Sequence, residues 1–344
     1  MMSKAYGIDL GTSTLTIYSK GDGIIYDEKN VIAVLDEKRV IAIGNDAYDM
    51  YGKAPDNISV SYPVQYGVIA DIKNMNSMIN LVFEKISEQH GRVNGGEFII
   101  SIPTDVTEVE KRAFVELIEE SDAAPRSVKI VDRPIANALG AGLDVNQPTG
   151  VMVVDIGADT TEISVMALGG IVLSKLIPVG GNKFDANIIN AVRKDYALVI
   201  GNKTAENLKI KLASAVRPKE DEISSMRVYG RDVISGLPVT KEIDSEFIYE
   251  AIYEHLMTIV DAVKSVLERT PPELASDIID SGIYVTGGSA RIKKLDRLLI
   301  HSTEQLINIC DDPGTTVAMG LGRIIERPAF SKLAVKLRMP QLKD

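Results

Sequence analysis

Two stretches with the same pattern, about 150 residues apart, constrain the fold of this 344-residue chain more than any other feature. Val151–Thr161 reads VMVVDIGADTT: an apolar run, then Asp155, one apolar residue, a glycine and hydroxyl residues. Near the N-terminus Ala5–Thr14 reads AYGIDLGTST, with Asp9 in the corresponding place. Apolar runs of this kind predict short buried strands. We therefore expect two related halves, each with a strand that ends in an acidic, glycine-containing turn.

The residue types in these turns suit a phosphate chain with its magnesium ion. Glycine lets the backbone approach, N–H and hydroxyl groups donate to phosphate oxygens, and the aspartate holds the metal or its waters. For one isolated copy an ordinary Asp-Gly turn is favoured by about two to one. Two copies in matching places instead favour two halves that face one ligand.

Composition and charge limit the class of protein. A chain of 344 residues with 45% hydrophobic content can bury a large core and should form two domains or lobes. The net charge of −10 argues against a nucleic-acid partner. Cys310 is the only cysteine, which excludes an internal disulfide and favours a reducing compartment. With no apolar run near ~18 residues and no signal peptide, we expect a cytoplasmic protein.

Hydrophobic periodicity predicts alternating strands and helices in both halves. Residues 44–67, rich in Tyr, Asn, Gly and Pro, are expected to be irregular, and residues 217–245 are expected to form a β-hairpin insertion. The other predicted strands are 15–19, 24–26, 31–35, 40–43, 98–102, 129–131, 162–167, 171–178 and 283–286. The predicted helices are 75–90, 107–118, 134–142, 184–196, 204–216, 245–268 and 315–325.

The tail Pro328–Asp344 mixes apolar and basic residues. Its apolar residues are Phe330, Leu333, Val335 and Leu337, and its basic ones include Lys332, Lys336 and Arg338. Such a segment either touches a membrane surface or is a solvated, partly docked tail, and we favour the second by about two to one.

Other catalytic patterns are missing from the sequence. The three histidines are scattered without metal-ligand spacing, and neither a P-loop nor a Gly-x-Ser-x-Gly elbow occurs. Thr107 and Glu110 have the spacing of a capping box, so the structural role of Glu110 is to bond back to the helix N-terminus. Phosphate chemistry is the activity that remains.

Segments along nearly the whole chain, in matching order, resemble the MreB family of bacterial actin homologues. They are GIDLGTST (7–14), GVIADI (67–72), TEVEKRA (107–113), VVDIGADTTE (153–162), AENLK (205–209), TPPELASDIIDSGIYVTGG (270–288) and 312–320. The resemblance implies an α/β, actin-like fold of the actin/Hsp70/sugar-kinase ATPase core, with two lobes, each a mixed sheet flanked by helices plus a small subdomain. The implied division is lobe I at 1–149 with an insertion at about 30–67, lobe II at 150–314 with an insertion at about 183–243, and a C-terminal helix and tail at 315–344 that pack on lobe I.

By matching positions, the resemblance also implies a site for ATP or ADP with Mg²⁺. Asp9 and Asp155 would be the magnesium-side carboxylates, and Glu110 would position the attacking water. The phosphates would be bound by Thr12, Ser13, Thr14, Gly157, Ala158, Asp159 and Thr160. Glu206 and Lys209 would reach the ribose and base, and Gly287, Gly288, Ser289 and Ala290 would line the adenosine.

The family likeness implies a slow ATPase that polymerises, usually as paired antiparallel filaments beneath the cytoplasmic membrane, and guides cell-wall synthesis. Catalysis of this kind needs an aligned water and neutralised leaving charge, with little covalent work by the protein. If the lobes close and complete the site only within filaments, hydrolysis would act as a timer for the polymer.

Several positions depart from the family pattern. Asp159 replaces a glycine, Thr14 and Leu15 replace an Asn-Thr pair, Arg133 replaces a glutamate, and Asn182 replaces an aspartate. A carboxylate at 159 should repel phosphate unless a cation compensates. The alternative is therefore a nucleotide-binding polymerising scaffold with negligible hydrolysis. A sugar kinase on the same core is disfavoured, because no large insertion carries clustered polar residues for a sugar.

Overall fold

The computed structural model describes residues 4–337 and divides into two units. Unit 1 comprises Met1–Thr149, Met166–Val172 and Gly314–Asp344, and unit 2 comprises Gly150–Val165 and Leu173–Pro313. Arg338, one of the basic residues of the tail, lies outside the described residues.

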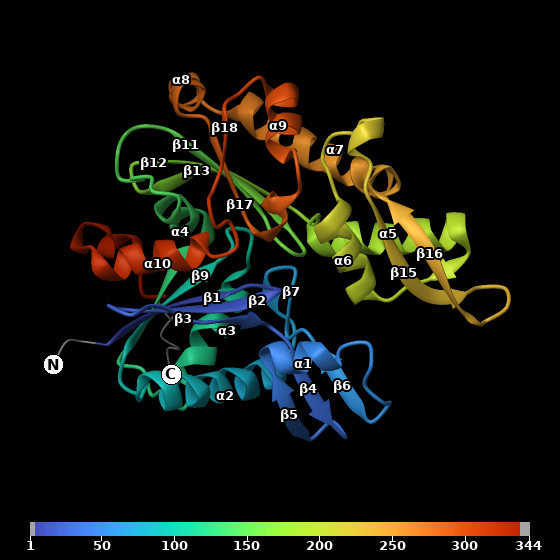
Figure 1. The fold of residues 1–344 in the computed structure, drawn as a ribbon. Coiled ribbons are helices and arrows are strands. Elements are labelled where there is room, and N and C mark those ends of the chain that lie inside the picture. Colours follow the sequence, from blue (N-terminus) through green and yellow to red (C-terminus); the bar gives the residue numbers. More distant parts are fainter. Residues whose placement is uncertain (1–3, 338–344) are drawn as a thin grey trace. The chain divides into compact units, whose positions relative to one another are not determined.

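Unit 1 is built on a five-stranded sheet with the order β10-β9-β1-β2-β3 (Figure 1). Its strands are β1 (Ala5–Leu10), β2 (Thr14–Ser19), β3 (Gly23–Lys29), β9 (Glu97–Ile102) and β10 (Ser127–Asp132). The first three pair antiparallel, and β9 is parallel to both β1 and β10. The helices of the unit are α2 (Ile72–His90), α3 (Glu108–Glu119), α4 (Arg133–Gly140) and α10 (Thr316–Glu326). Parallel strands need such helical crossovers, which cover the sheet and bury its apolar side chains.

Unit 2 repeats this arrangement with the strand order β13-β12-β11-β17-β18. Its strands are β11 (Val151–Ile156), β12 (Thr161–Ala167), β13 (Gly170–Ile177), β17 (Ile283–Thr286) and β18 (Ile307–Ile309). Its helices are α5 (Gly181–Tyr196), α6 (Asn202–Leu212), α7 (Ser245–Arg269), α8 (Pro272–Ser281) and α9 (Leu295–Thr303). In each sheet the strand that precedes the Asp-x-Gly turn lies between the next strand of the chain and a parallel strand. In unit 1, β1 lies between β2 and β9, and in unit 2, β11 lies between β12 and β17. The expectation of two related α/β halves is confirmed.

The insertion of unit 1 is more regular than the sequence indicates. It holds β4 (Ile32–Leu35), β5 (Arg39–Ile43), α1 (Gly44–Met50), β6 (Ile58–Ser61), β7 (Val64–Gln65) and β8 (Val68–Ile69). The prediction that 44–67 is irregular is therefore wrong. The reason is that α1 buries only Gly44 and Ala47, which leaves no helical period, and β6 is held by β4, more than twenty residues away.

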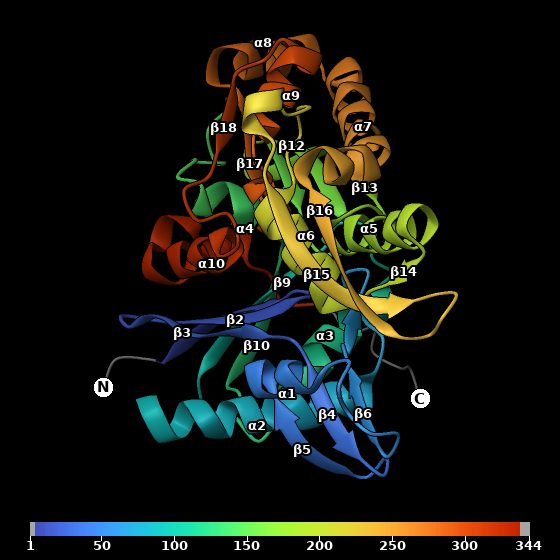
Figure 2. The same ribbon diagram turned by 45° about the vertical axis from the view of Figure 1, so that its right-hand side comes forward.

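The insertion of unit 2 contains the predicted hairpin. β15 (Ser225–Asp232) and β16 (Pro238–Asp244) pair antiparallel, and β14 (Leu198–Val199) joins them as a third strand. Figure 2 shows β15 and β16 side by side as a long, twisted ribbon. Short 3₁₀ turns occur at η1 (Glu220–Glu222) and at η2 (Gly288–Arg291), the second just after β17.

The described part of the tail is docked on unit 1. In η3 (Pro328–Leu333) the Phe330 ring is only 7% exposed. Beyond it, Val335 and Ile130 of β10 exchange backbone hydrogen bonds of 2.9 and 2.8 Å, while the Val335 side chain is 54% exposed. The docked interpretation therefore fits residues 328–337.

Within residues 4–337, none of the helices combines the length and the apolar composition that crossing a membrane requires.

Replacing Phe330 tests the docking of the tail. Phe330→Ala should lower the free energy of unfolding by about 3 kcal/mol, because it leaves a cavity where a buried ring packs. The exposed Val335→Ser, which keeps the backbone pairing, should change it by less than about 0.5 kcal/mol. Urea unfolding of the two variants beside the wild type measures both values, and equal midpoints for all three would contradict the docking.

Candidate functional site

In unit 1, Asp9 is held by two neighbours at the end of its strand. It is the last residue but one of β1, 9% exposed, and lies opposite Ser101 of β9. The Ser101 hydroxyl donates to Asp9 Oδ1 over 2.7 Å. The Arg133 guanidinium, at the start of α4, lies 3.6 Å from the same oxygen and donates to the Leu10 carbonyl over 3.4 Å. Asp9 therefore already has a cation beside it.

The turn that follows β1 is held by the buried side chain of Asn30, which lies between β3 and β4. Asn30 is fully buried, and its Nδ2 donates to the Gly11 carbonyl over 2.8 Å. Its backbone N–H donates to the Ser13 carbonyl over 2.9 Å. Thr12 Oγ1 accepts from the Gly67 N–H at 3.4 Å, and Thr14 begins β2. Because the Gly11 and Ser13 carbonyls are already hydrogen-bonded to Asn30, the shape of the turn is set before a ligand binds.

In unit 2, Asp155 occupies the equivalent place. It is the last residue but one of β11 and pairs in register with Thr286 of β17. The Gly157 N–H donates to the Thr160 carbonyl over 2.9 Å, which closes the second turn. An aspartate thus lies next to a hydroxyl residue of the adjacent parallel strand in both units, Ser101 in one and Thr286 in the other.

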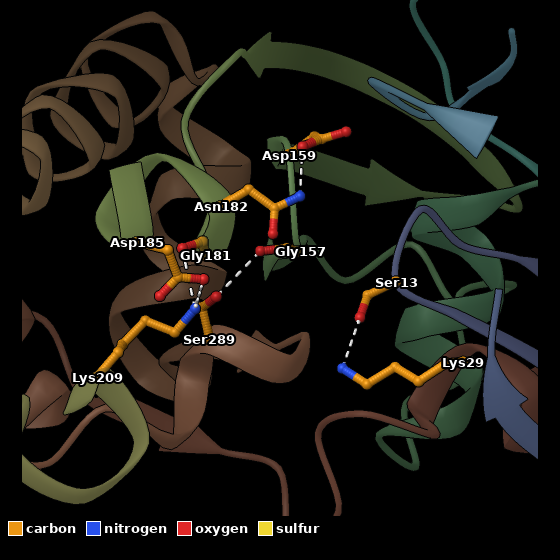
Figure 3. A network of polar contacts seen from close by, with 9 residues as sticks. All are labelled: Ser13, Lys29, Gly157, Asp159, Gly181, Asn182, Asp185, Lys209 and Ser289. Atoms are coloured by element: carbon orange, nitrogen blue, oxygen red, sulfur yellow. Dashed lines mark hydrogen bonds and ion pairs between the residues drawn. The ribbon is translucent and has the colours of Figure 1, made fainter. Parts of the chain in front are cut away.

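The second turn is bound to the start of α5 and to η2. The Gly157 carbonyl accepts from the Gly181 N–H and from the Ser289 hydroxyl, both over 3.0 Å (Figure 3). The Ala158 carbonyl accepts from the Asn182 N–H over 2.7 Å. The Ser289 bond brings a residue predicted for the adenosine against Gly157, which is predicted for the phosphates, within unit 2.

The two departures from the family pattern in unit 2 contact each other. The Asn182 amide Nδ2 donates to Asp159 Oδ1 over 2.8 Å (Figure 3). An aspartate at 182 would place a second carboxylate against Asp159, and like charges at this distance repel. The Asn182 amide is therefore compatible with Asp159 where the usual aspartate is not.

Lys209 of α6 is bound inside unit 2. Its ammonium donates to the Gly181 carbonyl over 2.9 Å and forms an ion pair with Asp185 over 2.7 Å, with both side chains largely buried. Glu206 lies one turn earlier on the same face of α6. The structure thus places Lys209 at the turn formed by Gly157 and Gly181, with its charge neutralised by Asp185.

Gly287 is required by the close approach of its backbone to Asp155. Its φ of +85° lies in the region that favours glycine. A Cβ at this position would meet Asp155 Oδ1 and the Ile156 carbonyl at 2.4 Å. Gly288, in contrast, has open space around the corresponding position. Of the two glycines, only Gly287 is therefore required by its close contact with Asp155.

Glu110 forms the predicted capping box at the start of α3. Its carboxylate accepts from the Thr107 N–H over 2.7 Å and from the Thr107 hydroxyl over 2.8 Å. Its role in positioning water stays a prediction. The side chains that the structure brings against Asp9 are Ser101 and Arg133.

Asp9 and Arg133 are both only 9% exposed. Removing either one would leave the other buried without its oppositely charged neighbour, which is destabilising.

A magnesium ion at Asp9 would share the carboxylate with the Arg133 guanidinium. Residues 4–337 hold no group of three or more His, Cys, Asp or Glu side chains that could bind a metal. A Mg²⁺ ion can use one or two carboxylates with phosphate oxygens and waters. At Asp9, however, it would meet the Arg133 guanidinium at the same oxygen. The assignment of Asp9 and Asp155 to magnesium stays a prediction.

Sequence reasoning missed several residues that hold these turns: Lys29, Asn30, Ser101 and Asp185. A polar Asn30 directly before the apolar run 31–35 was the one usable signal for a buried amide. Ser101 and Asp185 become visible only once strand pairing and helix packing bring them to Asp9 and Lys209.

Comparison with known proteins places this geometry among relatives. A family model described as MreB/Mbl protein matches residues 3–332. The cell shape-determining protein Mbl of Bacillus subtilis (strain 168) is 40% identical over 328 residues, which cover 95% of this chain and 97% of that protein. Crystal structures of MreB5 of Spiroplasma citri bound to AMPPNP and to ADP, 33% and 34% identical, superpose with TM-scores of 0.89 and 0.90. They cover 96% of this chain and 98% of theirs.

A more distant structure supports the fold alone. The MamK double helical filament is 21% identical, covers 94% of this chain and 98% of its own, and has a TM-score of 0.77. The α/β fold with two related sheets is therefore actin-like, as the sequence predicts.

The adjacent glycines at the end of β17 provide a matched test of how Asp155 is seated. Gly287→Ala should lower the free energy of unfolding by at least about 2 kcal/mol, because the new Cβ combines a left-handed φ with a collision against Asp155. Gly288→Ala has room for its methyl group and should change stability by less than about 0.5 kcal/mol. Thermal or urea unfolding measures both. Equal stability of the two variants would contradict the close packing of Gly287 on Asp155.

Proposed function

Because the chain belongs to the MreB/Mbl family, we propose that it is an ATP-binding cytoskeletal protein that assembles into filaments and takes part in determining cell shape. The observation that carries this proposal is the pair of equivalent turns, one in each unit, at the ends of strands in two sheets of the same order. A relative of known structure binds AMPPNP and ADP, which supports a nucleotide as the ligand.

The proposed phosphate-binding groups lie in the two turns, one in each unit. Backbone N–H groups and hydroxyls of Thr12, Ser13 and Thr14 bind phosphate oxygens from unit 1. The turn Gly157–Thr160 contributes the same kind of donors from unit 2. On the adenosine side, Ser289 and Lys209 are already gathered at the second turn by their bonds to Gly157 and Gly181. Glu206 and the flat Gly287–Gly288 step complete this side.

Two observations favour the form of this function in which hydrolysis is negligible. The Glu110 carboxylate is already used as a helix cap, because it accepts hydrogen bonds from the Thr107 N–H and hydroxyl. Arg133 stands at Asp9, where it competes with a metal ion for the carboxylate. In this form, nucleotide binding itself would control filament assembly, and hydrolysis would contribute little.

Association with the cytoplasmic membrane and with cell-wall synthesis proteins is part of the proposal through the family alone. In residues 328–337, Phe330 packs inward and Val335 pairs with β10, so these residues already have an intramolecular role. We therefore assign membrane contact to no residue of the tail.

Nucleotide-dependent pelleting tests the proposed function. Purified protein should bind ATP and form filaments that sediment at high speed and appear by negative-stain electron microscopy. Pelleting should change by at least severalfold between ATP and nucleotide-free conditions, because assembly is coupled to nucleotide binding. Protein that neither binds ATP nor pellets under any nucleotide condition would contradict the proposal.

Phosphate release separates slow from negligible hydrolysis. Glu110→Gln is the informative variant, because glutamine preserves the capping box while the carboxylate is lost. We expect phosphate release from ATP to be close to the protein-free rate for the wild type and unchanged in the variant, with and without filaments. A measurable wild-type rate that falls tenfold or more in Glu110→Gln, with pelleting unchanged, would instead establish Glu110 as the residue that positions water.

A further inference from the structure

A lysine lies directly on the phosphate turn of unit 1. Lys29 is the last residue of β3 and is paired in register with Thr14 of β2. Its ammonium donates to the Ser13 hydroxyl over 3.3 Å, as Figure 3 shows. The contact joins a full positive charge to one of the side chains that the sequence predicts for phosphate.

The surroundings of Lys29 fix the direction of its side chain. The ammonium lies 4.6 Å from the centre of the Tyr48 ring, a cation–π distance, and the Lys29 backbone N–H donates to Asn45 Oδ1 over 3.2 Å. The neighbouring Glu28 carboxylate forms an ion pair with Lys85 of α2 over 2.5 Å. Lys29 is therefore held toward Ser13 before a ligand binds, which lowers the entropic cost of the contact.

The chemistry of this pair suits an anion. Ser13 Oγ accepts from Lys29, so the hydrogen of its own hydroxyl can donate to another acceptor. A donated hydrogen bond from a cation also polarises the hydroxyl and strengthens it as a donor. A lysine ammonium binds a phosphate oxygen as a point charge.

We propose that Lys29 is a phosphate-binding residue that, together with Ser13, contacts the polyphosphate of a nucleoside di- or triphosphate. This inference rests on the proposed function, since it names a residue of the same nucleotide site. The sequence motifs do not include position 29.

The test compares two lysines of unit 1. Lys29→Met keeps an unbranched side chain over Tyr48 and removes the charge, and Lys38→Met makes the same change at an exposed turn residue. Dissociation constants are measured for ATP, ADP, AMP and adenosine at two salt concentrations, below the concentration that supports filaments. Lys29→Met should bind ATP about tenfold or more weakly, with adenosine changed less than about twofold. Lys38→Met should match the wild type, and Lys29→Arg should restore most of the ATP affinity.

A double-mutant cycle tests whether Lys29 acts together with Ser13. If the pair acts as a unit, Ser13→Ala combined with Lys29→Met should cost clearly less than the product of the two single losses. Unchanged ATP affinity in Lys29→Met overturns the inference, as does an equal loss for ATP and adenosine, which would indicate a structural role. A wild-type protein that binds none of the four ligands overturns the proposed function itself, and the inference with it. Matching thermal unfolding of the nucleotide-free variants excludes misfolding as the cause.

Discussion

The pairing of β1 with β9, and of β11 with β17, is the interaction on which the rest of this structure depends. Each pair is parallel, so the carboxyl ends of both strands meet at one edge, where an aspartate lies next to a hydroxyl residue. The carbonyls of the turn after the aspartate accept hydrogen bonds, from Asn30 in unit 1 and from Gly181 and Ser289 in unit 2. The two turns are prepared before any ligand binds.

Charge in the two turns is balanced locally, and the balance differs from the family pattern. In unit 1, Arg133 stands against Asp9, and Lys29 stands against Ser13. In unit 2, the Asn182 amide supports Asp159 where a second carboxylate would repel it. Asn182 and Asp159 are therefore two departures that support each other within unit 2.

Lys209 and Glu110 show that a matching motif does not determine which groups a side chain contacts. Both belong to segments that match the family, and both lie on the predicted helices. In the folded chain, however, Lys209 is neutralised by Asp185, and Glu110 caps its own helix. A motif identifies residue types at a spacing, whereas the partner that satisfies a buried charge depends on packing between elements far apart in the chain.

The sequence by itself determined the two related halves, most strands and helices, the hairpin at 217–245 and the two acidic turns. All of these follow from local periodicity or from a repeated pattern within a few residues. Only the tertiary structure decided that 44–67 is ordered, that Arg133 reaches Asp9 and that Lys29 reaches Ser13. Those features depend on strand register and on contacts between residues distant along the chain, such as β4 with β6 and α4 with β1, and local patterns do not encode such pairings.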